Sequence, residues 1–221
     1  MKKDYKYILF DLDGTLTDPK EGITKSFQYS LKHFGIEEEL SNLEKFIGPP
    51  LHDSFRNDYN FDDEKVENAV TKFREYFAEK GIFENKIFPN VKDTLEYLYN
   101  SNKTLLLATS KPTVFAKKVL EHFDIDKYFK YVGGSNLDGT RSEKNEVIDY
   151  VLKTCNISSM DEVIMIGDRK YDILGAQKIG VDSIGVLYGY GSLEELKEAN
   201  PNYIIVDIEE LKNILYFHMK L

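Results

Sequence analysis

Two patterns of apolar and polar residues follow each other in turn along most of the chain. Short apolar runs, typical of buried strands, occur at residues 5–10, 104–108, 131–134, 163–166, 182–187 and 203–206. Apolar residues at helical spacing lie between them, near residues 91–98, 114–123, 144–155, 173–179 and 208–217. Strands separated by helices predict an α/β fold with a doubly wound parallel sheet.

The segment after the first strand has a different pattern. From Asp18 to about Asn85 we find no convincing strand, and apolar residues recur at helical spacing near residues 23–34, 51–55 and 63–81. Ser41 and Glu44 have the spacing of a capping box at a further helix start. We therefore expect an all-helical domain of residues 18–85 inserted into an α/β core of residues 1–17 and 86–221.

Composition narrows the classes of function. The 221 residues, 42% of them hydrophobic, suit one domain with a modest insertion. A net charge of −9 argues against binding to nucleic acid polymers or anionic membranes. Cys155 is the only cysteine, so an intrachain disulfide is excluded, and we find no signal or membrane-spanning run. These features predict a cytoplasmic protein. The choice between a monomer and a homodimer stays open.

The first strand ends in the segment Asp11-Leu12-Asp13-Gly14-Thr15-Leu16-Thr17. Ligand sites of open α/β sheets lie at the carboxyl ends of the strands, and the spacing of Asp11 and Asp13 allows both to project to one side. Gly14 allows the backbone to bend close to a ligand. The alternative is a turn in which aspartate caps its own backbone.

Two later segments offer groups that could bind an anion. Thr109 and Ser110 follow the second long strand, where a hydroxyl and helix-start N–H groups can hold a phosphoryl oxygen, or where Thr109 can simply cap a helix. Lys144 lies near a predicted helix start, and Arg141 is a weaker candidate nearby. Taken alone, either side chain is better explained as a solvated surface charge.

A second pair of acids follows the most apolar strand. Asp168 lies at the strand end, and Asp172 lies about one helical turn further on. If both faced Asp11, they would form an oxygen-rich site suited to Mg²⁺. Alternatively, they could cap the helix and interact favourably with its dipole.

Taken together and in this order, the four segments resemble the motifs of the haloacid dehalogenase superfamily. The resemblance covers nearly the whole chain and is nearest to the phosphoglycolate-phosphatase-like branch, which has a Rossmann-like core and a helical cap. It implies that Asp11 is a nucleophile that forms an aspartyl-phosphate and that Asp13 is a general acid and base. It also implies that Lys144 pairs with the nucleophile and neutralises phosphate charge.

The same resemblance implies a metal site and a phosphate site. Asp11, Asp168 and the main-chain carbonyl of Asp13 would ligate Mg²⁺, and Asp172 would act through water or orient its neighbours. The residues that the resemblance and the strand-end positions assign to the phosphoryl group are Thr109, Ser110, Lys144 and Gly14.

The helical insertion contains candidates for substrate selection. Gly48, Pro49 and Pro50 resemble the cap segment that helps to select the leaving group, although the same residues are equally well explained as a helix break. Arg56 and His52 could meet an anionic substrate or could be solvated side chains of the insertion.

The resemblance predicts a Mg²⁺-dependent phosphomonoesterase for a small metabolite such as phosphoglycolate, a 5′-nucleotide or a sugar phosphate. Asp13 favours phosphatase or phosphomutase chemistry, because dehalogenase relatives lack this aspartate and transport ATPases have threonine there. Within the superfamily, a β-phosphoglucomutase-like mutase and a pyrophosphatase are alternatives. A phosphate-responsive binding module is the non-enzymatic alternative.

Overall fold

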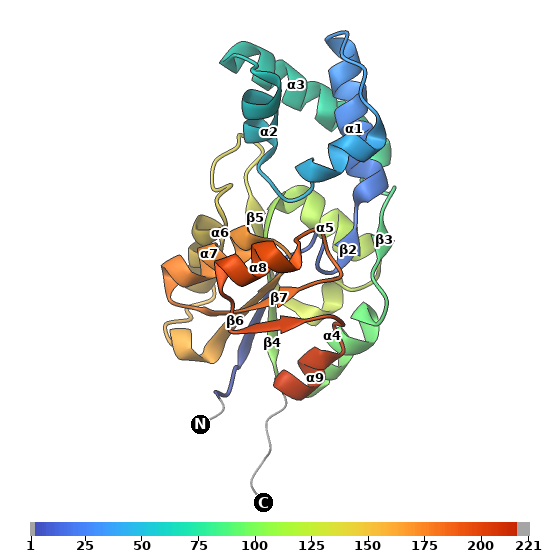
Figure 1. Ribbon diagram of the computed structural model, residues 1–221. Coiled ribbons are helices and arrows are strands. Elements are labelled where there is room, and N and C mark those ends of the chain that lie inside the picture. Colours follow the sequence, from blue (N-terminus) through green and yellow to red (C-terminus); the bar gives the residue numbers. More distant parts are fainter. Residues whose placement is uncertain (1–2, 216–221) are drawn as a thin grey trace, which may run out of the picture.

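The computed structural model describes residues 3–215 and contains one six-stranded parallel sheet (Figure 1). The strand order is β5-β4-β1-β6-β7-β8, and every neighbouring pair is parallel. These strands are β1 (Tyr7–Phe10), β4 (Thr104–Pro112), β5 (Phe129–Ser135), β6 (Val163–Gly167), β7 (Asp182–Val186) and β8 (Tyr203–Ile205). The doubly wound α/β sheet predicted from the apolar runs is confirmed.

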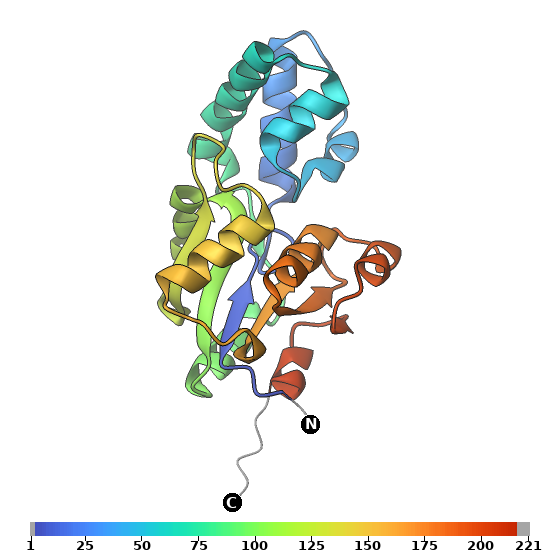
Figure 2. The ribbon, with the colours of Figure 1, turned by 90° about the vertical axis from the view of Figure 1, so that its left-hand side faces the viewer.

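Helices cover both faces of this sheet (Figures 1 and 2). The helices on one face are α4 (Val91–Asn100), α5 (Thr113–His122) and α9 (Glu210–Ile214), and those on the other are α6 (Lys144–Thr154), α7 (Lys170–Ile179) and α8 (Leu193–Ala199). Strand β1 shows why both faces must be covered. Ile8 and Phe10 pack into the core below α4 and α5, whereas Leu9 packs against α6 and α7.

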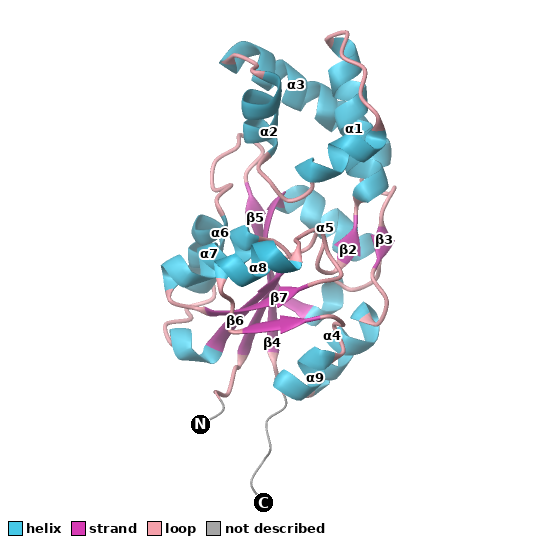
Figure 3. Ribbon diagram, viewed as in Figure 1, coloured by secondary structure: helices cyan, strands magenta, loops and turns pink. Residues whose placement is uncertain are grey.

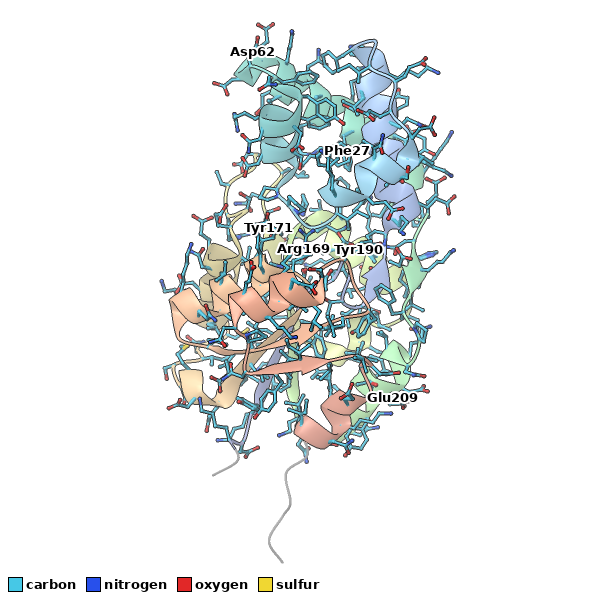
Figure 4. The ribbon with its side chains drawn as sticks, in the orientation of Figure 1. Phe27, Asp62, Arg169, Tyr171, Tyr190 and Glu209 are labelled. Atoms are coloured by element: carbon cyan, nitrogen blue, oxygen red, sulfur yellow. The ribbon has the colours of Figure 1, made fainter. Side chains whose placement is uncertain are left out.

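The helical insertion lies beyond the carboxyl ends of the strands, at the top of Figure 1. It contains α1 (Lys20–His33), a 3-10 helix (Leu40–Phe46), α2 (Leu51–Tyr59), α3 (Asp63–Tyr76) and a π-helical turn (Phe77–Gly81). The structure has no strand between residues 19 and 85, all of which it describes (Figure 3). The insertion has its own aromatic core around Phe27, whose ring centre lies 4.7 Å from Phe46, 5.0 Å from Phe55 and 5.1 Å from Phe73 (Figure 4).

Two short strands join the insertion to the core. Strand β2 (Thr17–Asp18) leaves the core and pairs in antiparallel fashion with β3 (Lys86–Ile87), which returns to it. The sequence analysis did not predict this pairing. It lies at the boundaries that we expect between a core of residues 1–17 and 86–221 and a cap of residues 18–85, a division that stays a prediction.

Three local predictions differ from the structure. Ser41 and Glu44 form no capping box, because they lie inside the 3-10 helix, whose N-cap is Glu39 without a side-chain cap bond. Helix α8 was not predicted, since it is short and buries few apolar residues. The closing helix was predicted for residues 208–217; α9 ends at Ile214, and residues 216–221 lie outside the described part. Within residues 3–215, none of the helices has the length and apolar character needed to cross a membrane.

Candidate active site

Four segments that are far apart in the sequence meet above the carboxyl ends of β1, β4 and β6. Carboxylate oxygens of Asp11, Asp168 and Asp172 lie within 4.8 Å of one another, and all three residues are buried. Lys144, the first residue of α6, places Nζ 2.8 Å from Asp11 Oδ1 and 2.8 Å from Asp172 Oδ1. The structure thus brings together three acids and one lysine that the sequence analysis selected separately.

The loop after β1 is shaped so that Asp168 can approach Asp11. Asp11 still follows the sheet register, because its N–H donates to the carbonyl of Ile166 in β6 at 2.9 Å. The chain then turns at Gly14, whose φ is +85°, and a Cβ atom there would lie 2.2 Å from Asp168 Oδ2. A glycine is therefore required by both the backbone angle and the space.

Residues of the β7–α8 loop and of the segment after β1 hold Asp168 in place. The N–H of Tyr190 donates to Asp168 Oδ2 at 2.8 Å, and the Thr15 hydroxyl donates to Oδ1 at 3.3 Å. The Tyr190 hydroxyl also donates to Asp18 in β2 (Figure 4 labels Tyr190). Tyr188 donates its hydroxyl proton to the carbonyl of Thr15 at 2.9 Å. Asp168 thus has a fixed orientation before any ligand binds.

The negative charges of Asp11, Asp168 and Asp172, together called the acidic group, repel one another, and Lys144 offsets only part of this repulsion. Burial raises the pKa of Asp168 well above its usual value, and the charges of Asp172 and Asp11 raise it further. Burial also raises the pKa of Asp172 to about 6, although Lys144 opposes the shift. Burial alone would lower the pKa of Lys144, but Asp11 and Asp172 outweigh it and raise that pKa.

The donor set fits a hard divalent cation. Oδ1 of Asp11 and Oδ1 of Asp172 are buried, and each lies 2.8 Å from the Lys144 ammonium. Together with Asp168, they offer only carboxylate oxygens, which Mg²⁺ prefers as protein ligands. A second positive charge would offset the three carboxylates better than Lys144 alone.

The Asp13 carboxylate does not join this acidic group. It forms an ion pair with Lys111, with Nζ 2.5 Å from Asp13 Oδ2, and the two side chains are 13% and 5% exposed. Burial raises the pKa of Asp13, and the charge of Lys111 opposes the shift. Lys111 was not among the site residues predicted from the sequence; its place two residues after Thr109, in a segment already singled out, was the available signal.

Thr109 and Ser110 lie at the end of β4, beside the acids. The buried Thr109 hydroxyl accepts from the N–H of Lys111 at 3.3 Å, whereas Pro112 is the N-cap of α5, without a side-chain cap bond. Thr109 therefore does not cap α5. Arg141 points elsewhere, because it donates to the carbonyl of Gly134 and to Asn136 Oδ1.

A pocket of about 120 Å³ lies between these residues and the helical insertion. Asp11, Asp13, Thr109, Ser110 and Lys111 line it from the core. The lining residues from the insertion are Ile23, Phe27, Phe46, Gly48, Pro49, Pro50, Leu51, His52, Phe73, Arg74 and Phe77. The Gly-Pro-Pro segment and His52 thus face the acids, and so does Arg74, which the sequence analysis did not select.

Arg56 does not line this pocket. It is exposed on α2 and forms an ion pair with Asp63, with Nη2 2.9 Å from Oδ1. A different arginine joins the insertion to the core. Arg169 donates from Nη1 to the carbonyl of Ile47 at 2.8 Å and from Nε to Glu195 Oε1 at 2.8 Å (Figure 4). The sequence analysis missed this contact, because it forms only across the two parts of the fold.

Comparisons with known proteins agree with this geometry. The family model described as haloacid dehalogenase-like hydrolase matches residues 8–186. A 5′-nucleotidase of Pseudomonas aeruginosa is 46% identical over 97% of each chain. A solved structure from Clostridium difficile, provisionally described as a phosphatase, is 66% identical, with a TM-score of 0.87 over 97% of this chain and 100% of that one.

A further relative has a different name. The tyrosine-protein kinase PtkA of Mycobacterium tuberculosis is 32% identical over 94% of this chain and 72% of that protein. The names of the three relatives, a 5′-nucleotidase, a phosphatase and a tyrosine-protein kinase, describe different reactions. The chain described here belongs to the haloacid dehalogenase-like hydrolase family and is an enzyme of its phosphatase type.

Proposed function

We propose that the protein is a Mg²⁺-dependent phosphomonoesterase that acts on a small phosphorylated metabolite through an aspartyl-phosphate. One observation carries the proposal: the buried Asp11 carboxylate lines the pocket, 2.8 Å from Lys144 and within 4.8 Å of Asp168 and Asp172. Such a carboxylate is positioned as a nucleophile, and the neighbouring charges can offset those of a phosphate.

The residues that would hold Mg²⁺ are Asp11, Asp168 and the main-chain carbonyl of Asp13. Asp172 would act through water or by orienting Lys144, which it contacts at 2.8 Å. When bound, the cation would neutralise negative charge on the phosphoryl oxygens and so reduce their repulsion of the attacking carboxylate.

The chain supplies a group for each proton and bond of the reaction. An Asp11 oxygen attacks phosphorus while the bond to the ester oxygen breaks, and Asp13 gives its proton to that oxygen. Asp13 then takes a proton from a water molecule, whose oxygen attacks the phosphorus of the aspartyl-phosphate. The bond between phosphorus and the Asp11 oxygen breaks, which frees the Asp11 carboxylate and yields inorganic phosphate. Lys144, Thr109, Ser110 and the N–H groups near Gly14 would hold the phosphoryl oxygens meanwhile.

The raised pKa of Asp13 supports its role as the acid. A carboxyl group with a raised pKa is protonated in a larger fraction of molecules near neutral pH, as proton donation requires. Burial of the carboxyl group is the main cause of the shift. The same burial would protect the aspartyl-phosphate from uncontrolled attack by solvent.

Asp11→Asn tests the proposal with p-nitrophenyl phosphate as the substrate and MgCl₂ present. We expect turnover to fall by about 10⁴-fold or more, as for loss of other catalytic nucleophiles, with unchanged far-UV circular dichroism. Asp149→Asn is the matched control, because Asp149 lies on α6 and contacts Lys153 outside the site. Normal turnover by Asp11→Asn would refute the nucleophile, and hence the proposal.

The same assay separates the alternatives. Hydrolysis without a bisphosphate primer favours the phosphatase over a β-phosphoglucomutase-like mutase, which must retain its phosphoenzyme. Faster release of phosphate from pyrophosphate than from any ester would favour a pyrophosphatase. Phosphate binding without turnover of any phosphorylated compound would favour a binding module.

A further inference from the structure

One charge in the active-site pocket has no counter-ion. The side chains lining the pocket that can be charged are Asp11, Asp13, His52, Arg74 and Lys111. Asp11 pairs with Lys144, Asp13 pairs with Lys111, and His52 Nε2 lies 3.4 Å from Glu67 Oε1. The Arg74 side chain forms neither a hydrogen bond nor an ion pair with any residue between 3 and 215.

The surroundings of Arg74 do not compensate its charge. The side chain is half-buried on α3, and burial lowers the pKa of its guanidinium group, which the more distant charges of Glu67 and Asp138 only partly oppose. A buried cation without a partner is costly, whereas other arginines of this chain, such as Arg56 and Arg169, form ion pairs. A guanidinium left free in a pocket is suited to bind a planar or tetrahedral anion with two parallel hydrogen bonds.

Arg74 and the candidate phosphate site occupy opposite sides of the pocket. Asp11, Thr109 and Ser110 come from the core, whereas Arg74 comes from the helical insertion. The insertion side is otherwise mostly apolar, with Phe27, Phe46, Phe73, Phe77 and the two prolines among its lining residues. Lys144 already offsets the charge of the transferring phosphoryl group, so Arg74 remains available to bind the leaving group.

We propose that Arg74 is a specificity-determining residue that binds a negatively charged group, a carboxylate or a second phosphoryl group, on the leaving-group side of the substrate. The inference rests on the proposed function, because it presumes that the transferring phosphoryl group lies beside Asp11. The pocket has a volume of about 120 Å³, so we expect a small substrate that carries both anionic groups.

The test compares two matched esters, phosphoglycolate and ethyl phosphate, which differ in the carboxylate. For Arg74→Gln we expect kcat/KM for phosphoglycolate to fall about 10- to 100-fold, the usual effect of losing a hydrogen bond to a charged group. The value for ethyl phosphate should change by less than about threefold, since its leaving group offers Arg74 no anion. Arg74→Lys should restore part of the phosphoglycolate activity.

The control variant is Lys72→Gln. Lys72 lies on the same helix and pairs with Glu75 at 2.9 Å, so this change removes one positive charge without altering the pocket lining. Both esters should keep wild-type values. Repeating the comparison with pyrophosphate identifies the anionic group: a larger Arg74 dependence for pyrophosphate than for phosphoglycolate supports a second phosphoryl group, and the reverse supports a carboxylate.

A second measurement needs only the wild-type protein and so does not depend on the folding of a variant. We expect 3-phosphonopropionate, which carries a carboxylate, to inhibit p-nitrophenyl phosphate hydrolysis about tenfold more tightly than propylphosphonate, which does not. Equal inhibition, or equal losses for both esters in Arg74→Gln, would overturn the role of Arg74. Failure of the wild-type protein to hydrolyse p-nitrophenyl phosphate would instead count against the proposed function.

Discussion

Lys144 is the best place to test how the acidic group is held together. Its Nζ lies 2.8 Å from oxygens of both Asp11 and Asp172, and its side chain is 5% exposed. At an effective dielectric constant of about 20, each contact is worth about 6 kcal/mol of attraction. Desolvation cancels much of this attraction, and removing one partner of a buried ion pair costs about 3–5 kcal/mol.

Lys144→Met keeps the length of the side chain and removes its charge. In EDTA at pH 8 we expect the free energy of unfolding, measured by urea denaturation, to fall by about 3–5 kcal/mol. The matched control is Lys153→Met on the same helix; its side chain is 76% exposed and pairs with Asp149, so the expected loss is below about 0.5 kcal/mol.

The loss in Lys144→Met should depend on pH. A carboxyl group whose pKa is raised in the folded protein destabilises the fold above that pKa, and the cost disappears as the pH falls through it. The pKa of Asp172 is about 6 even beside Lys144, and that of Asp168 is also raised. The destabilisation should therefore be largest at pH 8 and clearly smaller at pH 5. Equal losses at both pH values, or no loss at all, would refute this account.

Three other changes probe neighbouring features. Gly14→Ala should lower the free energy of unfolding by about 1–3 kcal/mol more than Gly35→Ala in urea denaturation, because both glycines have positive φ but only Gly14 has Asp168 within 4 Å. Arg169→Gln should loosen the insertion, seen as faster trypsin cleavage within residues 18–85 at an unchanged melting temperature of the core; unchanged cleavage would contradict the bridging role of Arg169. Mg²⁺ at 100 times its Kd should raise the free energy of unfolding by about 2.7 kcal/mol in thermal unfolding. Asp168→Asn should abolish this stabilisation, and NaCl at the same ionic strength should not produce it.

The strands and most helices followed from local patterns. Four-residue apolar runs such as Tyr7–Phe10 are buried on both faces of a parallel sheet, and few other environments accept them. The sequence predicts that Asp11 and Asp168 lie close together, because the carboxyl ends of parallel strands lie at the same end of the sheet, and the structure has them so. Where apolar content was low, as in α8, or where a polar pair had the right spacing by chance, as at Ser41 and Glu44, the local pattern failed.

The sequence by itself determined the α/β sheet, the helical character of the insertion and the residues that line the sheet edge, because burial and chain direction act locally and leave a period in the sequence. Only the tertiary structure decided how charged side chains are partnered. Lys111 and Arg74 are ordinary lysine and arginine in the sequence, yet one is buried against Asp13 and the other faces the pocket without a counter-ion. The energy of a charge depends on what surrounds it in space, and the fold brings those surroundings from distant segments.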